Sequence, residues 1–86
     1  MQISYTPHFV RMFQSLPTGL QAEVADVIET FRDKSNHVRL KVHKLKGRLS
    51  GSYAFSVNYQ TRIVFQYEKG DDVILTAIGD HDIYRL

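Results

Sequence analysis

The chain has 86 residues, of which 43% are hydrophobic and 23% charged, and its formal net charge is +2. This length suits one domain with a single core, which we expect to span residues 1–86. The sequence has no cysteine, which excludes disulfides and thiolate metal sites, and no run reaches the ~18 apolar residues of a membrane span. The first residues also lack a signal-peptide pattern, so a soluble cytoplasmic protein is expected.

The first half of the sequence predicts one short strand and two helices. Residues 2–5 are the strand candidate, and Thr6-Pro7 marks a helix start, with threonine as the cap and proline at the first helical position. Pro17 ends this helix. Thr18 opens the second helix, and Gln21 completes a capping-box pattern. The apolar residues of both helices recur on one face, so we expect them to form core rather than to carry chemistry.

Alternating residues in the second half predict extended segments. Apolar and basic residues alternate through 38–43, so this segment is expected to be extended, with His43 on its basic face. Three strands follow, at residues 52–59, 61–67 and 73–78. The alternation in the first of them places Tyr59 on the same face as Phe55. The expected fold class is α+β, with two helices on one face of an antiparallel sheet and a partly polar face left open.

Positive charge is concentrated in residues 37–50, which contain five basic residues and no acidic one. Such a block is typical of a surface that binds a polyanion such as RNA. A solvated loop that only keeps the protein soluble is the alternative interpretation. The candidate RNA-binding residues are Arg39, Lys41, Lys44, Lys46 and Arg48.

Two histidines and an arginine form a candidate catalytic set for RNA cleavage. Cleavage without a metal needs a base for the 2′-hydroxyl, an acid for the leaving 5′-oxygen and a cation for the transition state. His43, Arg62 and His81 supply these groups, and either histidine could take either proton role. Tyr84 is a further candidate. A surface, turn, ion-pair or packing role is the structural alternative for each. Neither a cofactor nor a metal is expected, because the histidines and acids lack a metal-ligand spacing.

Three motifs resemble the RelE/ParE superfamily of toxins from type II toxin–antitoxin systems. The segment 45–53 is similar to one that YoeB-type toxins carry before their second strand. The segment 61–65 resembles the strand that bears the phosphate-binding arginine of the RelE and YoeB branches. The segment 78–81 resembles the strand exit where ribonuclease members place a catalytic arginine or histidine. In element order the resemblance covers nearly the whole chain, and it implies a RelE-like fold.

The resemblance also implies roles for single residues. His43 falls where YoeB-like toxins use a glutamate as general base and YafQ-like toxins have a histidine. Arg62 falls on the arginine that stabilises the cleaved phosphate, and His81 on the general-acid position. Tyr84 lies near a C-terminal aromatic residue that positions the RNA in several members.

The function that this resemblance implies is a ribosome-dependent mRNA endonuclease that needs no metal. Its expected partners are mRNA and ribosomal RNA in the decoding site, and a cognate antitoxin that buries Arg62 or displaces residues 81–86. The sequence departs from RelE at two lysine positions, where Ala54 and Ser56 stand. A ParE-like DNA gyrase inhibitor and a non-catalytic relative that only binds an antitoxin remain the alternatives.

Overall fold

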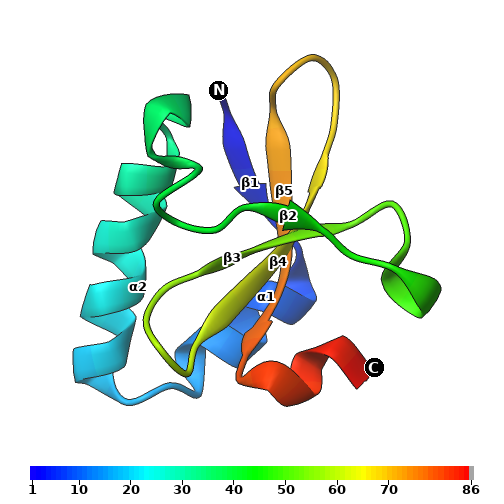
Figure 1. Cartoon of the computed structure of the whole chain (residues 1–86). Helices are drawn as coiled ribbons and strands as arrows, with labels where there is room; N and C mark the ends of the chain where they lie inside the picture. Colours follow the sequence, from blue (N-terminus) through cyan, green and yellow to red (C-terminus); the bar gives the residue numbers. More distant parts are fainter. Residues whose placement is uncertain (86) are drawn as a thin grey trace.

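Within residues 1–85, which the computed structural model describes, five strands form one sheet (Figure 1). They are β1 (Ile3–Tyr5), β2 (His43–Lys44), β3 (Tyr53–Ser56), β4 (Arg62–Tyr67) and β5 (Val73–Gly79). Their order in the sheet is β1-β5-β4-β3-β2. Neighbours from β2 to β5 are antiparallel, whereas β1 pairs in parallel with β5. The predicted α+β class is confirmed, with one parallel pair added at the edge of the sheet.

Helix α1 (Pro7–Gln14) begins as the sequence predicts. The Oγ1 atom of Thr6 accepts a hydrogen bond from the backbone N–H of Phe9 at 3.0 Å, and Pro7 occupies the first turn. The threonine satisfies one of the amide donors that a helix start leaves free, and proline has no such donor to satisfy. The local sequence is therefore sufficient to set this boundary.

Helix α2 (Thr18–Phe31) starts where predicted, but the predicted capping box is wrong. Its N-cap is Pro17, which makes no side-chain cap. The side-chain amide of Gln21 instead donates to the carbonyl oxygens of Phe13 and Leu16, at 3.2 and 3.0 Å. Gln21 therefore satisfies carbonyls at the end of α1 and ties the two helices together. Among the described residues, neither helix is long and apolar enough to cross a membrane.

The core lies between the two helices and one face of the sheet. Phe31 of α2 is central to it: its ring stacks on Phe55 with centroids 4.2 Å apart and meets Phe65 edge-on at 5.0 Å. Fully burying a side chain of this size contributes roughly 1.5–3 kcal/mol. The buried members of this cluster are Phe9, Val24, Ile28, Phe31, Phe55, Val57, Ile63, Phe65, Val73, Leu75 and Ile78.

Residues 38–43 do not form the extended segment that their alternation predicts. The chain turns instead, Lys41 adopts a φ of 61°, and strand pairing begins only at His43. Leu40 packs against the core, whereas Val38 is 91% exposed. The apolar positions therefore do not share one buried face, and the basic side chains between them do not share the opposite face.

Three short 3-10 helices lie in the connections: η1 (Lys34–Asn36), η2 (Gly47–Leu49) and η3 (His81–Arg85). The last of them, red in Figure 1, covers part of the sheet face opposite the helices, where Ile83 packs with Val64 and Ala77. Gly79 permits this approach, because a Cβ at that position would lie 2.5 Å from the Cγ2 of Ile83. The open sheet face is therefore smaller than the sequence predicts.

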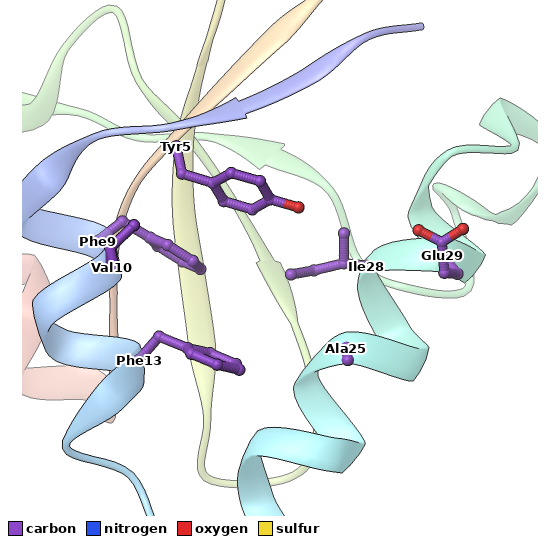
Figure 2. A pocket seen from close by; sticks show the side chains of 7 residues that line it. All are labelled: Tyr5, Phe9, Val10, Phe13, Ala25, Ile28 and Glu29. Atoms are coloured by element: carbon purple, nitrogen blue, oxygen red, sulfur yellow. The ribbon is translucent and has the colours of Figure 1, made fainter.

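An apolar cavity of 340 Å³ opens between α1, α2 and β1 (Figure 2). The side chains of Tyr5, Phe9 and Phe13 face Ile28 across it, and Glu29 stands at the α2 side. This lining includes neither a histidine nor a cation. The cavity therefore lacks the cationic group that would bind a phosphate.

Candidate active site

Arg62 and His81 meet at one end of the sheet. The Nη2 atom of Arg62 lies 3.4 Å from the Nε2 atom of His81. Arg62 is the first residue of β4 and stands opposite Gly79 of β5, and His81 follows two residues later. A guanidinium has only donors, so we assign Nε2 of His81 as the acceptor and place its ring proton on Nδ1. The register of β4 and β5 thus brings together two of the predicted catalytic residues.

An open, polar cleft of 550 Å³ surrounds this pair. One wall comes from the connection between β3 and β4, and the other from the chain after β5. The lining residues are Tyr59, Gln60, Arg62, Asp80, His81 and Asp82. A cationic group and an imidazole in a cleft that solvent can enter are suited to binding a phosphate group.

Two backbone carbonyls hold the Arg62 guanidinium in place. Its Nη1 atom donates to the carbonyl oxygen of Asn58 at 2.6 Å and to that of Thr61 at 3.2 Å. These bonds leave Nη2 directed toward His81. A donor that is already positioned can stabilise developing charge without reorganising during the reaction.

Tyr84 adds a hydroxyl to this region from η3. Its ring meets the imidazole of His81 edge-on, with centroids 5.8 Å apart. Within the described residues, the buried Tyr84 hydroxyl has no hydrogen-bond partner. Burial raises the pKa of Tyr84, and the positive charge of Arg62 opposes this shift in part. An unpaired buried hydroxyl costs about 1–3 kcal/mol, and Tyr84 is not among the residues that line the cleft.

His43 lies on the same sheet face but outside the cleft. It pairs with Ala54 of β3, which pairs with Val64 of β4, two residues from Arg62. Strand spacing and rise put the Cα atoms of His43 and Arg62 about 12 Å apart. The Nδ1 atom of His43 lies 2.8 Å from the carbonyl oxygen of Lys41 and donates to it, so Nε2 of the neutral ring has a free lone pair. The Nε2 atom of His43 can therefore accept a proton. The ring is too far from Arg62 for direct contact, so only a bound RNA could connect the two side chains.

The five candidate RNA-binding residues, Arg39, Lys41, Lys44, Lys46 and Arg48, are all exposed. Lys44 belongs to β2 and also lines a hollow of 190 Å³ beside Ser50 and Gly51. Arg39 lies in the preceding turn and donates to the side-chain oxygen of Asn36 at 3.2 Å. Because residues 38–43 are not extended, these cations are spread over a turn, strand β2 and η2 instead of one strand face, and their contact with RNA stays a prediction.

The cleft also contains a residue that the sequence reasoning misplaced. Tyr59, expected inward beside Phe55, is 92% exposed at the cleft wall. The signal that was missed is Asn58, whose side-chain oxygen accepts from the backbone N–H groups of Gln60 and Thr61 at 2.9 and 2.8 Å. Asparagine favours such turns, and this one ends β3 at residue 56 instead of 59.

No family model and no curated protein matches the sequence. Solved structures match it over nearly its whole length. YafQ from E. coli superposes with a TM-score of 0.77 at 10% identity, covering 95% of this chain and 94% of that one. The YoeB–YefM complex from Staphylococcus aureus superposes with a TM-score of 0.70 at 18% identity, covering 94% of this chain and 97% of that one. The toxin–antitoxin complex RelBE2 from Mycobacterium tuberculosis superposes with a TM-score of 0.69 at 16% identity, covering 93% of this chain and 96% of that one. The chain therefore has the fold of the RelE, YoeB and YafQ structures.

Proposed function

We propose that this protein is the toxin of a type II toxin–antitoxin system and cleaves mRNA on the ribosome without a metal. The observation that carries the proposal is the contact between Arg62 and His81 in an open cleft. The fold shared with RelE and YoeB structures supports the same class of protein. A toxin that acts by binding gyrase needs neither a phosphate-binding arginine nor a general acid, so the contact between Arg62 and His81 favours the nuclease over the ParE-like alternative.

In this proposal Arg62 binds the scissile phosphate. Nη1 stays on the carbonyl of Asn58, while Nη2 donates to a non-bridging phosphate oxygen. Negative charge accumulates on these oxygens as the 2′-oxygen attacks phosphorus, and the fixed guanidinium stabilises that charge. A phosphate that enters between Arg62 and His81 replaces their mutual contact, so both groups can donate to it.

His81 acts as the general acid. Its contact with Arg62 needs an unprotonated Nε2, whereas a phosphate oxygen at the same place favours a protonated one. The proton on Nε2 passes to the 5′-oxygen as the phosphorus–oxygen bond to that atom breaks. The new bond from the 2′-oxygen leaves a 2′,3′-cyclic phosphate on the upstream fragment. A positioned acid of this kind typically contributes ~10²–10⁴-fold to the rate.

His43 acts as the general base in the same scheme. Its Nε2 lone pair can accept the proton of the 2′-hydroxyl, and its side chain projects from the sheet face that carries Arg62. The RNA must be held across this face for both groups to reach one nucleotide. The ribosome would hold the RNA in that geometry. Correct positioning contributes greatly to the rate, so a protein with few reactive groups can rely on it.

An antitoxin is the second partner that we propose. The RelBE2 and YoeB–YefM structures are complexes of a toxin with its antitoxin. For this protein, a bound segment that covers Arg62 would block the cleft. A segment that lifts residues 81–85 off the sheet would instead remove His81 from it. Residue 86, which belongs to the predicted displaced tail, lies outside the described residues.

A translating extract tests the nuclease. Wild-type protein should create new RNA ends within codons of ribosome-bound messages, and the double variant Arg62→Ala/His81→Ala should not. His8→Ala is the matched control, because His8 is an exposed histidine on α1. Absence of cleavage by wild type, or undiminished cleavage by the double variant, would contradict the proposal. Inhibition of gyrase supercoiling without cleavage would establish the ParE-like alternative.

A further inference from the structure

Tyr59 exposes an aromatic ring at the wall of the proposed catalytic cleft. The residue is 92% exposed and lines the same cleft as Arg62 and His81. A tyrosine normally packs much of its ring against other apolar groups. Tyr59 thus presents an almost uncovered ring beside the two groups that would bind the phosphate.

The loop that carries Tyr59 is firmly held. The Asn58 side chain accepts from the backbone N–H groups of Gln60 and Thr61, and its amide donates to Glu23 of α2 at 2.9 Å. A backbone hydrogen bond from residue 57 to residue 61 closes the turn at 2.9 Å. These contacts position Tyr59 through its neighbours, although its own ring is free.

The same loop also holds Arg62. The carbonyl oxygen of Asn58 accepts a hydrogen bond from Nη1 of Arg62 at 2.6 Å. Tyr59 is the next residue after Asn58 in the chain. The backbone that carries the ring and the guanidinium are therefore held by the same residue, Asn58. A nucleotide whose phosphate binds Nη2 has its base within reach of the ring.

We propose that Tyr59 is the stacking platform for the nucleobase attached to the phosphate that Arg62 binds. This inference rests on the proposed nuclease function and deepens it, because it makes the cleft a nucleotide site rather than a phosphate site. Every base offers a π-face, so an exposed tyrosine beside a cation recognises single-stranded RNA with little sequence preference. Purines should bind more tightly than pyrimidines because their ring systems cover more of the tyrosine.

The surroundings of Tyr59 favour a nucleotide over a protein partner. The cleft is lined by Gln60, Arg62, Asp80, His81 and Asp82 in addition to the ring. A protein hot spot would set an aromatic anchor among apolar groups that exclude water. A polar wall around one ring instead suits a base, which stacks through its face and forms hydrogen bonds through its edges.

Binding can be tested separately from cleavage. The chain has no tryptophan, so Tyr59→Trp introduces at the platform a single tryptophan, whose fluorescence can be excited selectively over that of the tyrosines. The probe is an RNA trinucleotide with 2′-O-methyl groups, which cannot be cleaved, and the control probe lacks the central base. We expect the complete probe to quench the fluorescence and the abasic probe to bind about tenfold or more weakly. Lys69→Trp, beyond the far end of β4, should show no quenching.

Cleavage provides the second readout. On ribosomes, Tyr59→Ala should reduce cleavage about ten- to hundredfold with an unchanged melting temperature, and Tyr59→Phe should stay within about threefold of wild type. No quenching by any probe, or equal quenching by the abasic probe, would overturn the platform. So would a Tyr59→Ala variant that cleaves normally and loses only antitoxin binding. Base-dependent quenching by a protein that never cleaves would uphold the platform and refute the nuclease.

Discussion

Arg62 and Gly79 are direct partners in the β4–β5 ladder, and this pairing brings the site together. His81 follows Gly79 by two residues, which sets its Nε2 atom 3.4 Å from the Arg62 guanidinium. The missing side chain of Gly79 also gives Ile83 room to pack on the sheet. One backbone pairing therefore positions the imidazole and anchors the segment that carries Tyr84.

Replacing Gly79 by alanine should displace η3 and weaken the site. The new Cβ would lie 2.5 Å from Cγ2 of Ile83, closer than any relaxed contact. We expect a loss of about 1–3 kcal/mol in the free energy of unfolding, measured by urea denaturation, and a parallel loss of RNA cleavage. Leucine lacks Cγ2, so adding Ile83→Leu should recover part of both. A double variant no better than Gly79→Ala alone would contradict this account.

Arg62→Lys should reduce cleavage although it keeps the positive charge. A lysine carries its three donors on one nitrogen, so it cannot reach the carbonyl of Asn58 and a phosphate oxygen from two separate nitrogens, as the planar arginine fork can. We expect a decrease of about 10²–10³-fold in the single-turnover rate on ribosomes, similar to the loss of one oriented donor in other enzymes. Arg11→Lys, on the exposed side of α1, is the matched control and should change nothing. Equal cleavage rates for Arg62→Lys and Arg11→Lys would show that cleavage does not need the two-nitrogen geometry of the Arg62 guanidinium.

His81→Gln should be rescued by a better leaving group. If His81 protonates the 5′-oxygen, the variant should cleave ordinary RNA about 10²–10⁴-fold more slowly. An RNA with sulfur in place of that 5′-oxygen needs no proton on the leaving group and should be cleaved at nearly the wild-type rate. His43→Gln, which removes the proposed base, should not be rescued by sulfur. Rescue of His43→Gln and not of His81→Gln would exchange the two roles.

Tyr84→Phe should separate stability from activity. Its buried hydroxyl has no partner among the described residues, so its removal should keep or raise the free energy of unfolding at neutral pH. Burial raises the folded pKa of Tyr84 above 10.0, so the neutral phenol stabilises the fold below that pH. This contribution is lost as the pH rises through the folded pKa, and the phenylalanine variant should lack that loss.

Denaturant unfolding of wild type and Tyr84→Phe between about pH 8 and 11 measures this difference. RNA cleavage by the same variant should decrease if Tyr84 positions the RNA, which is the role that the resemblance implies for it. A variant that is less stable at pH 8, or one that cleaves normally, would show that the hydroxyl has a structural role instead.

The sequence predicted correctly those parts of the fold that depend on interactions between residues close together in the chain. Thr6 and Pro7 start α1 by interactions within one turn, and the sequence shows both of them. Gln21 matched an equally local capping pattern at the start of α2. Its amide instead donates to carbonyls of α1, a tertiary interaction that no pattern within one helix reveals.

The site was predictable in its chemistry and less so in its geometry. Arg62 and His81 could be nominated because their side chains suit phosphate and proton transfer. Their contact depends on the register of β4 and β5, which includes an irregularity between residues 64 and 65. The position of His43 relative to them depends on the turn at Lys41, where the alternating pattern predicted a strand. Tyr59 was misplaced because one asparagine turned the chain earlier than the alternation indicated.

The parallel pairing of β1 with β5 also orders events during synthesis. Residues 3–5 are made well before their partners, residues 73–75, and β5 must enter between β1 and β4. Contacts so distant in sequence form late. The cleft needs β4, β5 and His81 together, so a growing chain cannot form it before His81 has been made.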